Sequence, residues 1–127
     1  MDESWLASDR TARWRSASGH GPDDGARASG SSLIEIEPGF KLPLHTDSAE
    51  EVIVVIAGRA EVTVDGELAE VGAGELALVP EDVPHEIRNT GEEPLRFAAV
   101  YAGTDVVTTY ADDVQPDGDR QRSPVKG

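Results

Sequence analysis

Short apolar segments separated by turn residues fill the middle of the chain. Apolar and polar positions alternate in residues 32–37, 60–64, 67–71 and 85–89, and longer apolar runs occupy residues 51–58 and 95–102. Alternation with a period of two predicts half-buried β-strands, and no segment shows the helical period convincingly. Further strands are expected at residues 41–45, 75–80 and 106–110.

The breaks between these segments are typical of tight turns. Asp65-Gly66 is the clearest, because both residues tolerate positive φ and the flanking segments alternate as a two-residue hairpin requires. Pro and Gly mark the other breaks. Eight or nine antiparallel strands therefore follow one another without long helical connections. A β-sandwich or a closed barrel is the economical arrangement, since closure removes exposed strand edges.

The two ends of the chain differ from this middle part. Residues 1–30 are polar and rich in Gly, Ser and Asp, so we expect an N-terminal arm whose apolar anchors are Trp5, Leu6 and Trp14. The two tryptophans either pad the barrel wall or dock the arm on a partner subunit. Residues 112–127 are charged and contain proline, which is typical of a flexible tail. The barrel is expected over residues 31–111.

Composition limits both the site chemistry and the partners. The chain has 25 acidic and 11 basic residues and a net charge of −14, which disfavours binding to nucleic acids and anionic membranes. No apolar run has membrane-spanning length and the N-terminus is acidic, so we expect a cytoplasmic protein. The acidic, lysine-poor composition leaves open a halophilic source. Because cysteine is absent, a metal would need imidazole and carboxylate ligands.

The first candidate ligands lie between Gly39 and Gly58. His45 and Asp47 are two residues apart, so extended backbone directs both side chains to the same face. Glu51 follows a short connection at the start of the next apolar run, where it stands at the rim of the core. Glu50 is the obvious alternative, but the alternation pattern favours Glu51 inside and Glu50 in solvent.

A second segment supplies another imidazole. Pro80 and Pro84 bracket a turn, after which His85 begins a strand and shares one face with Ile87 and Asn89. Two imidazoles and at least one carboxylate inside a barrel suit one divalent ion of iron, manganese, nickel, copper or zinc. The spacing alone does not choose among these metals.

Both segments resemble the two sequence motifs of the cupin superfamily. The first motif has the order Gly, His, His, Glu, Gly, and the positions here are Gly39, His45, Asp47, Glu51 and Gly58. The second has the order Gly, Pro, Gly, His, Asn, and the positions here are Gly74, Pro80, Asp82, His85 and Asn89. The resemblance covers about residues 32–102 and implies an all-β fold, the double-stranded β-helix or jelly roll. It also implies a homodimer, with the arm or edge strands at the interface.

Two positions depart from the cupin motifs. Asp82 replaces a turn glycine, and the turn should survive because Asp tolerates that geometry. Asp47 replaces a metal-binding histidine, so the set implied by the resemblance becomes His45, Asp47, Glu51 and His85. Asp47 either ligates directly or acts through water. A further alternative is a metal-free barrel that serves as a ligand cup. His20 is expected to be exposed, and Asn89 to be a turn or wall residue.

Three function classes remain open at this stage. An iron(II)-dependent dioxygenase acting on a small organic molecule is the leading hypothesis. A metal-dependent isomerase or cyclase, in which Glu51 or Asp47 moves a proton, is the second. A non-catalytic barrel that binds or senses a small ligand is the third. Phe40, Phe97 and Tyr101 are candidates for the substrate pocket, although aromatic residues on alternating strands usually belong to the core.

Overall fold

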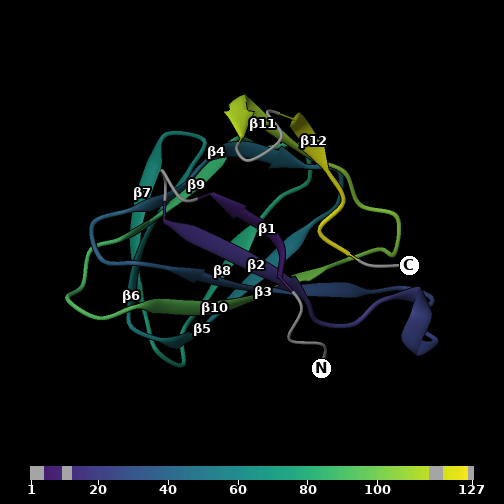
Figure 1. The fold of residues 1–127 in the computed structure, drawn as a ribbon, viewed down its shortest axis with the longest axis horizontal. Coiled ribbons are helices and arrows are strands. Elements are labelled where there is room, and N and C mark those ends of the chain that lie inside the picture. The colour runs from purple at the N-terminus through teal and green to yellow at the C-terminus, as the bar shows by residue number, and fades with distance from the viewer. Residues whose placement is uncertain (1–4, 10–12, 115–118, 126–127) are drawn as a thin grey trace.

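The fold consists almost entirely of antiparallel β-strands (Figure 1). The computed structural model describes residues 5–9, 13–114 and 119–125. Within these ranges the one helix is a short 3-10 turn, η1 (Pro22–Asp24). No helix in the described residues has the length and apolar character needed to cross a membrane.

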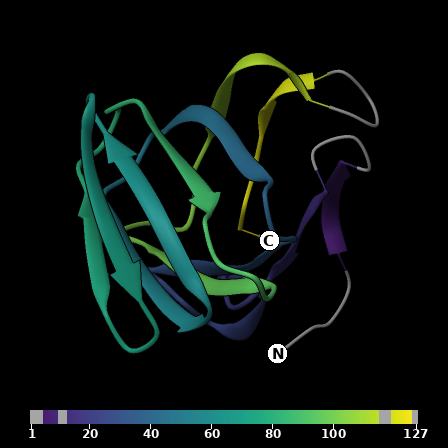
Figure 2. The same ribbon diagram turned by 90° about the vertical axis from the view of Figure 1, so that its left-hand side faces the viewer.

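The strands form two sheets of six. The order in the first sheet is β1 (Trp5–Asp9), β2 (Trp14–Ser18), β3 (Gly30–Ile36), β10 (Leu95–Tyr101), β5 (Glu51–Ala57) and β8 (Leu76–Val79). The order in the second sheet is β12 (Asp119–Arg122), β11 (Thr108–Val114), β4 (Lys41–Asp47), β9 (His85–Asn89), β6 (Arg59–Val64) and β7 (Glu67–Gly72). The chain passes repeatedly between the sheets, which confirms the predicted jelly roll. Figure 2 shows β1 in purple on the opposite side of the molecule from the teal β6–β7 hairpin.

The core lies between the two sheets, where the inward positions of alternating strands meet. Residues at every second position of β3, β9 and β10 are buried, and the same holds for β5 as far as Val55. The fully buried side chains include Ile36, Ile53, Ile87, Leu95 and Phe97. The parity argument from the sequence therefore gives the correct face for these strands.

The predicted turns have the expected backbone conformation. Asp65 and Gly66 join β6 to β7 with φ angles of 49° and 82°, as a two-residue hairpin with positive φ at both positions requires. Asp82 has a φ of 58°, so aspartate occupies the left-handed conformation at the position where the cupin motif has glycine. The substitution leaves the turn before β9 in place.

The N-terminal segment differs from the expected arm in part. Trp14–Ser18 pairs with β3 as a regular strand of the first sheet. Trp14 is only 3% exposed and packs against Tyr110 at a ring centroid distance of 6.1 Å. It is therefore part of the barrel wall. Trp5 and Leu6 lie in β1, and their side chains are outside the described part of the structure.

The C-terminal segment also contributes to the fold. We expected residues 112–127 to form a flexible tail, but Asp119–Arg122 pairs with β11 as β12. Val125 is 2% exposed and packs on Gly30, where a Cβ atom would meet the valine methyl groups at 2.6 Å. Glycine at position 30 thus makes room for one apolar residue of the tail. The remaining positions 115–118, 126 and 127 lie outside the described residues.

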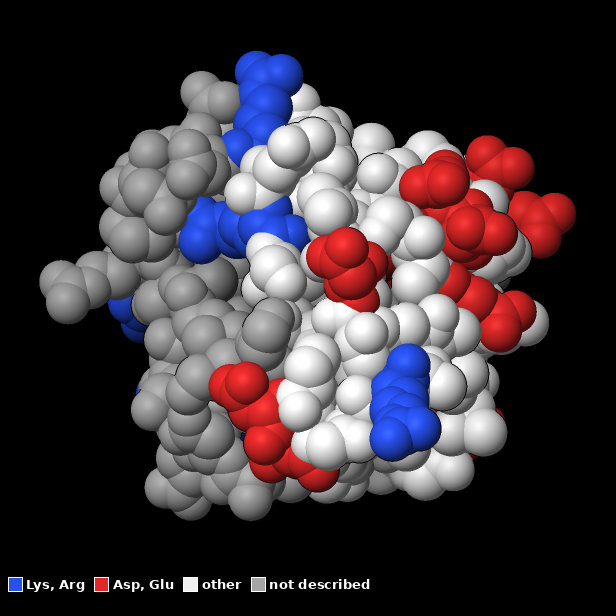
Figure 3. Space-filling view, turned by 90° about the vertical axis from the view of Figure 1, so that its right-hand side faces the viewer, with Lys and Arg blue, Asp and Glu red and all other residues white. Residues whose placement is uncertain are grey.

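Charged side chains are grouped rather than evenly mixed on one face of the molecule. The end of the molecule at the right of Figure 1 shows separate acidic and basic groups with uncharged surface between them (Figure 3). The charged side chains that this face shows are therefore unevenly distributed (Figure 3).

Gly58 and Gly66 allow a matched test of backbone packing. Both have positive φ, 88° and 82°, but a Cβ at Gly58 would lie 3.0 Å from the Pro94 oxygen, whereas Gly66 has nothing within 4 Å. Gly66→Ala should cost about 1 kcal/mol of unfolding free energy through strain, and Gly58→Ala about 3 kcal/mol through strain and contact. Urea unfolding measures both, and equal losses would contradict the role of the Pro94 contact.

Candidate metal centre

Strand pairing in the second sheet brings the predicted ligands together. His45 on β4 is directly opposite His85 on β9, after a register shift between Leu42 and His45. On the other side of β4, Asp47 is opposite Thr108 of β11. His45, Asp47 and His85 are all at most 4% exposed. The centre is therefore built across three neighbouring strands and is buried.

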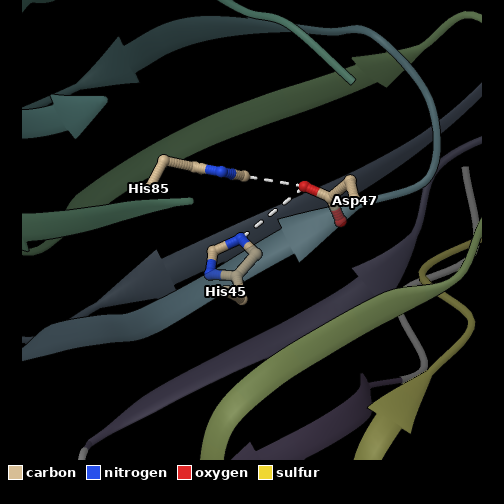
Figure 4. Close-up of side chains that lie close together, drawn as sticks. All are labelled: His45, Asp47 and His85. Atoms are coloured by element: carbon tan, nitrogen blue, oxygen red, sulfur yellow. Dashed lines mark ion pairs between the residues drawn. The ribbon is translucent and has the colours of Figure 1, made fainter. Parts of the chain in front are cut away.

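His45, Asp47 and His85 direct one donor atom each toward a common point (Figure 4). The Oδ2 atom of Asp47 lies 3.2 Å from His85 Nε2 and 3.7 Å from His45 Nε2. The two imidazole rings are 4.1 Å apart between centroids. All three donor atoms lie within 4.8 Å of one another. The arrangement is a compact set of two imidazoles and one carboxylate.

Backbone carbonyl groups orient both imidazoles. Nδ1 of His45 lies 2.6 Å from the Pro43 oxygen, and Nδ1 of His85 lies 2.9 Å from the Val83 oxygen. Since a carbonyl can only accept, each Nδ1 carries the proton and donates it. Each Nε2 is then the nitrogen directed to the centre. This is the usual way in which proteins hold metal-binding histidines.

Glu51 lies beside this group and comes from the other sheet. It is the first residue of β5, is 2% exposed, and its Oε1 atom is 3.1 Å from His85 Nε2. The compact group of three contains Asp47 rather than Glu51, although the cupin motif has the glutamate as a ligand. Glu51 is therefore a buried neighbour of the three-residue set, which it contacts through His85. Glu50 is exposed, as expected.

Asp47 is held from two directions. The hydroxyl of Thr108 donates to Oδ1 of Asp47 at 2.5 Å, and the backbone N–H of Asp82 donates to the Asp47 carbonyl at 2.8 Å. Oδ2 is buried and accepts no hydrogen bond of good geometry. One carboxylate oxygen is thus fixed by the protein and the other is directed to the two Nε2 atoms.

The electrostatics of the pair His85 and Asp47 favour the charged forms. Burial alone would lower the pKa of His85, but its contacts with Asp47 and Glu51 raise that pKa to about 10. Burial is the largest single influence on Asp47 and would raise its pKa, but the contacts with His85, His45, Glu51 and Thr108 together outweigh burial and lower that pKa to about 2. Without a metal, His85 therefore keeps a proton that balances the aspartate charge at neutral pH.

Glu51 and His45 are shifted toward their neutral forms. Burial raises the pKa of Glu51 to about 7, and the negative charge of Asp47 acts in the same direction. Burial lowers the pKa of His45 to about 4, and the positive charge of His85 adds to that effect. His45 is therefore neutral at pH 7 and has the free Nε2 lone pair that a metal ligand needs.

The donor set fits a divalent transition metal. Imidazole nitrogen and carboxylate oxygen are borderline to hard donors that bind iron, manganese, nickel, copper and zinc. Asp47 Oδ2 is a buried charged atom without a good hydrogen bond, and an ion would satisfy it. His85 would lose its proton to such an ion, because a metal ligand must be the neutral imidazole. The residues present can therefore hold one metal ion per chain.

The three aromatic pocket candidates lie at different depths. Tyr101 at the end of β10 is 4% exposed and lines a small cavity next to His45 and Glu51. Phe97 is fully buried in the apolar core. Phe40 precedes β4, is 36% exposed, and has the Arg13 guanidinium 5.9 Å from its ring centroid. Only Tyr101 of these three lines the cavity.

Asn89 and His20 have structural roles. The side chain of Asn89 donates to the carbonyls of Ile36 and Glu93 and accepts from the Gly91 N–H, so all its bonds tie loops to the barrel. His20 is half-buried rather than exposed, and its ring bonds to the Ser31 and Ser29 hydroxyls. Asn89 is a wall residue, as the sequence predicts.

Two residues near the centre, Thr108 and Tyr110, were not identified from the sequence, and Trp14 was expected in the barrel wall but not beside the centre. Thr108 bonds to Asp47, Tyr110 packs on the His45 ring at 5.2 Å between centroids, and Trp14 packs on Tyr110. Thr108 and Tyr110 have the same parity in the segment 106–110, which indicates that they share a face. Nothing in the sequence shows that this strand pairs with β4.

Comparison with known families places residues 32–101 in the cupin domain family. The matched region is more than half of the chain and contains all four predicted ligands. The chain therefore belongs to the cupin family. The strands β2 and β11, which carry Trp14, Thr108 and Tyr110, lie outside the matched residues.

Two curated relatives illustrate the sequence similarity. The polyketide synthase CurC of Streptomyces cyaneus is 34% identical over 74 residues, which is 58% of this chain and 48% of that protein. An uncharacterized protein of Methanocaldococcus jannaschii is 37% identical over 69 residues, which is 52% of this chain and 55% of that protein. The chain thus spans about half the length of these relatives.

The structural similarity extends beyond the matched region. Bacillus subtilis oxalate decarboxylase, in a structure reported for its Mn(II) centres, superposes with a TM-score of 0.75 and 23% identity. The match covers 86% of this chain and 30% of the decarboxylase chain. At this level of identity the likeness establishes the fold.

The Thr108 hydroxyl is expected to support metal affinity through Asp47. Thr108→Val keeps the shape of the side chain but removes the hydrogen bond to Oδ1, so the dissociation constant for Zn(II) should rise about 10- to 100-fold. Thr109→Val is the matched control, because Thr109 is the adjacent residue of β11 on the opposite face. Competition with a chromophoric chelator measures both, and an unchanged constant for Thr108→Val would exclude this role.

Proposed function

We propose that this chain is a metal-dependent cupin enzyme that oxidises a small organic molecule with dioxygen, using iron(II). The observation that carries the proposal is the compact set His45, Asp47 and His85. Two histidines and one carboxylate with open positions are typical of non-haem iron(II) oxygenases. Bound iron(II) would supply redox chemistry and Lewis acidity at this point of the barrel.

The protein residues have separate tasks in this proposal. His45, Asp47 and His85 would hold the ion, with their orientation fixed by Pro43, Val83 and Thr108. Glu51 would either be a fourth ligand or accept a proton from the substrate, because its carboxyl group is next to the set and its pKa is raised to about 7. Burial of the centre excludes bulk water from the reaction.

The names of the relatives support a metal at this site and an oxygen-bearing substrate. The decarboxylase structures concern Mn(II) centres and oxalate, and CurC is named a polyketide synthase. Both names involve oxygen-rich organic molecules. They favour an oxygen-bearing substrate for this chain and leave the reaction type to experiment.

A non-redox proton transfer is the second candidate. It is favoured by the position of Glu51, which has a carboxyl group poised near neutral pH beside two other buried ionisable side chains. In this case zinc or nickel would polarise a substrate carbonyl, and Glu51 or Asp47 would move a proton. The reaction would be an isomerisation or a cyclisation.

Oxygen uptake separates the two candidates. The protein is loaded anaerobically with Fe(II) or Zn(II) and mixed with acetylacetone, catechol or oxalate, and dioxygen consumption is followed with an electrode. The proposal predicts uptake with Fe(II) and at least one of these compounds, and none with Zn(II). Glu51→Gln should lower the rate about 100-fold or more if Glu51 moves a proton. Glu50→Gln, its exposed neighbour, should leave the rate unchanged.

Other outcomes would overturn the redox proposal. Proton exchange with solvent deuterium in the Zn(II) or Ni(II) form, without oxygen uptake in the iron form, would favour the isomerase or cyclase. A fully metal-loaded protein that turns over none of these compounds but is thermally stabilised by one of them would favour a ligand-binding barrel.

A further inference from the structure

The two sheets have very different outer faces. In the second sheet, the outward positions of β4, β9 and β6 carry charged side chains, among them Lys41, Glu61, Glu86 and Arg88. In the first sheet, two rows of outward positions cross β3, β10, β5 and β8 without a charge. These rows are Leu33, Ala98, Val54 and Leu76, and Ser31, Val100, Val52 and Leu78. Together with Ile56 of β5 they form the apolar face of the molecule.

The apolar face is accessible at its β8 side. Leu76 and Leu78 are 64% and 58% exposed, and Ile56 is 56% exposed. Single exposed apolar residues are ordinary, but these lie together on two paired strands. β8 is also the edge strand of the sheet, and it has none of the charged residues or prolines that usually protect an edge. The arrangement therefore indicates a surface for contact with another molecule.

One end of the apolar face has a net positive charge. Arg13 and Arg15 pair with Glu37 and Glu35, and Arg96 also contacts Glu35. Arg15, Glu35 and Arg96 are cross-strand neighbours on β2, β3 and β10, so they border the apolar rows directly. Two arginines share one glutamate at this border.

The other end of the apolar face is negative. Glu50 immediately precedes β5, is exposed, and has the parity of the outward residues Val52 and Val54. Its carbonyl accepts from the Ala102 N–H, so the pairing of β5 with β10 continues to this point. Glu75 before β8 is turned toward β7, where it accepts a backbone N–H. Acidic loop residues follow at both ends and do not reverse the difference: Glu92 and Glu93 before β10, and Glu81, Asp82 and Asp105 after β8 and β10.

We propose that the apolar face binds the same face of a second copy of this chain, with the two sheets stacked and their strands running in opposite directions. A closed pair of identical chains uses one patch twice, so each contact occurs in two symmetric copies. With opposed strands, Arg96 of each chain lies opposite Glu50 of the other, while the apolar rows cover each other. With strands in the same direction, Arg96 would face Arg96. The charges therefore select the opposed arrangement.

The proposed contact is separate from the metal centre. The apolar face lies on the outer side of the first sheet, whereas Glu51 and the other candidate ligands are buried on the inner side. The proposal is therefore independent of the proposed function. It also locates the contact on the face of the sheet rather than on the N-terminal arm.

Within one chain, Arg96 and Glu50 are too far apart to affect each other. Arg96 is paired with Ala57, and positions 50 and 57 are separated by roughly 20 Å of extended strand. Charges at the surface are screened beyond about 8 Å at physiological salt. An effect at one residue that depends on the other therefore reports a contact between two copies.

Sedimentation equilibrium of the full chain over a range of concentrations measures the dissociation constant of the dimer. Leu78→Glu places a charge in the apolar face and should raise this constant about 100-fold. Leu68→Glu is the matched control, because Leu68 is 60% exposed but lies on β7 of the second sheet. It should leave the constant unchanged. An unaltered circular dichroism spectrum shows that each variant is folded.

Exchange of the two charges tests the direction of the strands. Arg96→Glu and Glu50→Arg should each raise the dissociation constant about tenfold, because each places like charges opposite one another at two symmetric contacts. The chain that carries both substitutions should dimerise nearly as the wild type does, since the pair is formed again with its signs exchanged.

Four results would overturn the proposal. The first is a wild-type protein that sediments as a monomer at every concentration. The second is a Leu78→Glu variant that dimerises as the wild type does, and the third is equal weakening by Leu68→Glu. The fourth is a double variant of Arg96 and Glu50 that remains as weak as the single variants.

Discussion

Four ionisable side chains are buried together at one end of an apolar barrel, and this burial determines the chemistry of the centre. His45, Asp47, Glu51 and His85 are each at most 4% exposed. Burying charge in an apolar interior is unfavourable unless the charges compensate one another. In the absence of an ion, the proton on His85 compensates Asp47, and Glu51 is shifted toward its neutral form. A divalent ion would take over the role of that proton.

The same constraint explains the surrounding hydrogen bonds. Pro43 and Val83 accept from the two Nδ1 atoms, and Thr108 donates to one oxygen of Asp47. These contacts use the outer atoms of the ligands, so that the inner atoms are left to face one another. Replacement of the usual cupin histidine by Asp47 fits this arrangement because Thr108 stands opposite it on β11. The position that departs from the motif is thus supported by a strand outside the motif.

The sequence predicts much of the fold because the relevant signals are local. Alternation identifies the strands, Asp65-Gly66 identifies a hairpin, and parity directs His45 and Asp47 to one face. Parity does not give depth along a strand: Phe97 and Tyr101 share a face of β10, yet only Tyr101 reaches the cavity. Thr108 and Tyr110 were missed because their importance depends on which strands pair, and pairing over 60 residues leaves no local pattern. The tail was misread because Val125 is one apolar residue in a polar segment.

The central claim is that His45, Asp47 and His85 together hold a metal ion. The most direct measurement is elemental analysis of protein purified without chelators or a metal-affinity tag, with Asp47→Ala and His85→Ala alongside and His20→Ala as the control. The account predicts about one divalent ion per chain in the wild type and in His20→Ala, and almost none in the other two variants. A full metal content in His85→Ala would contradict it.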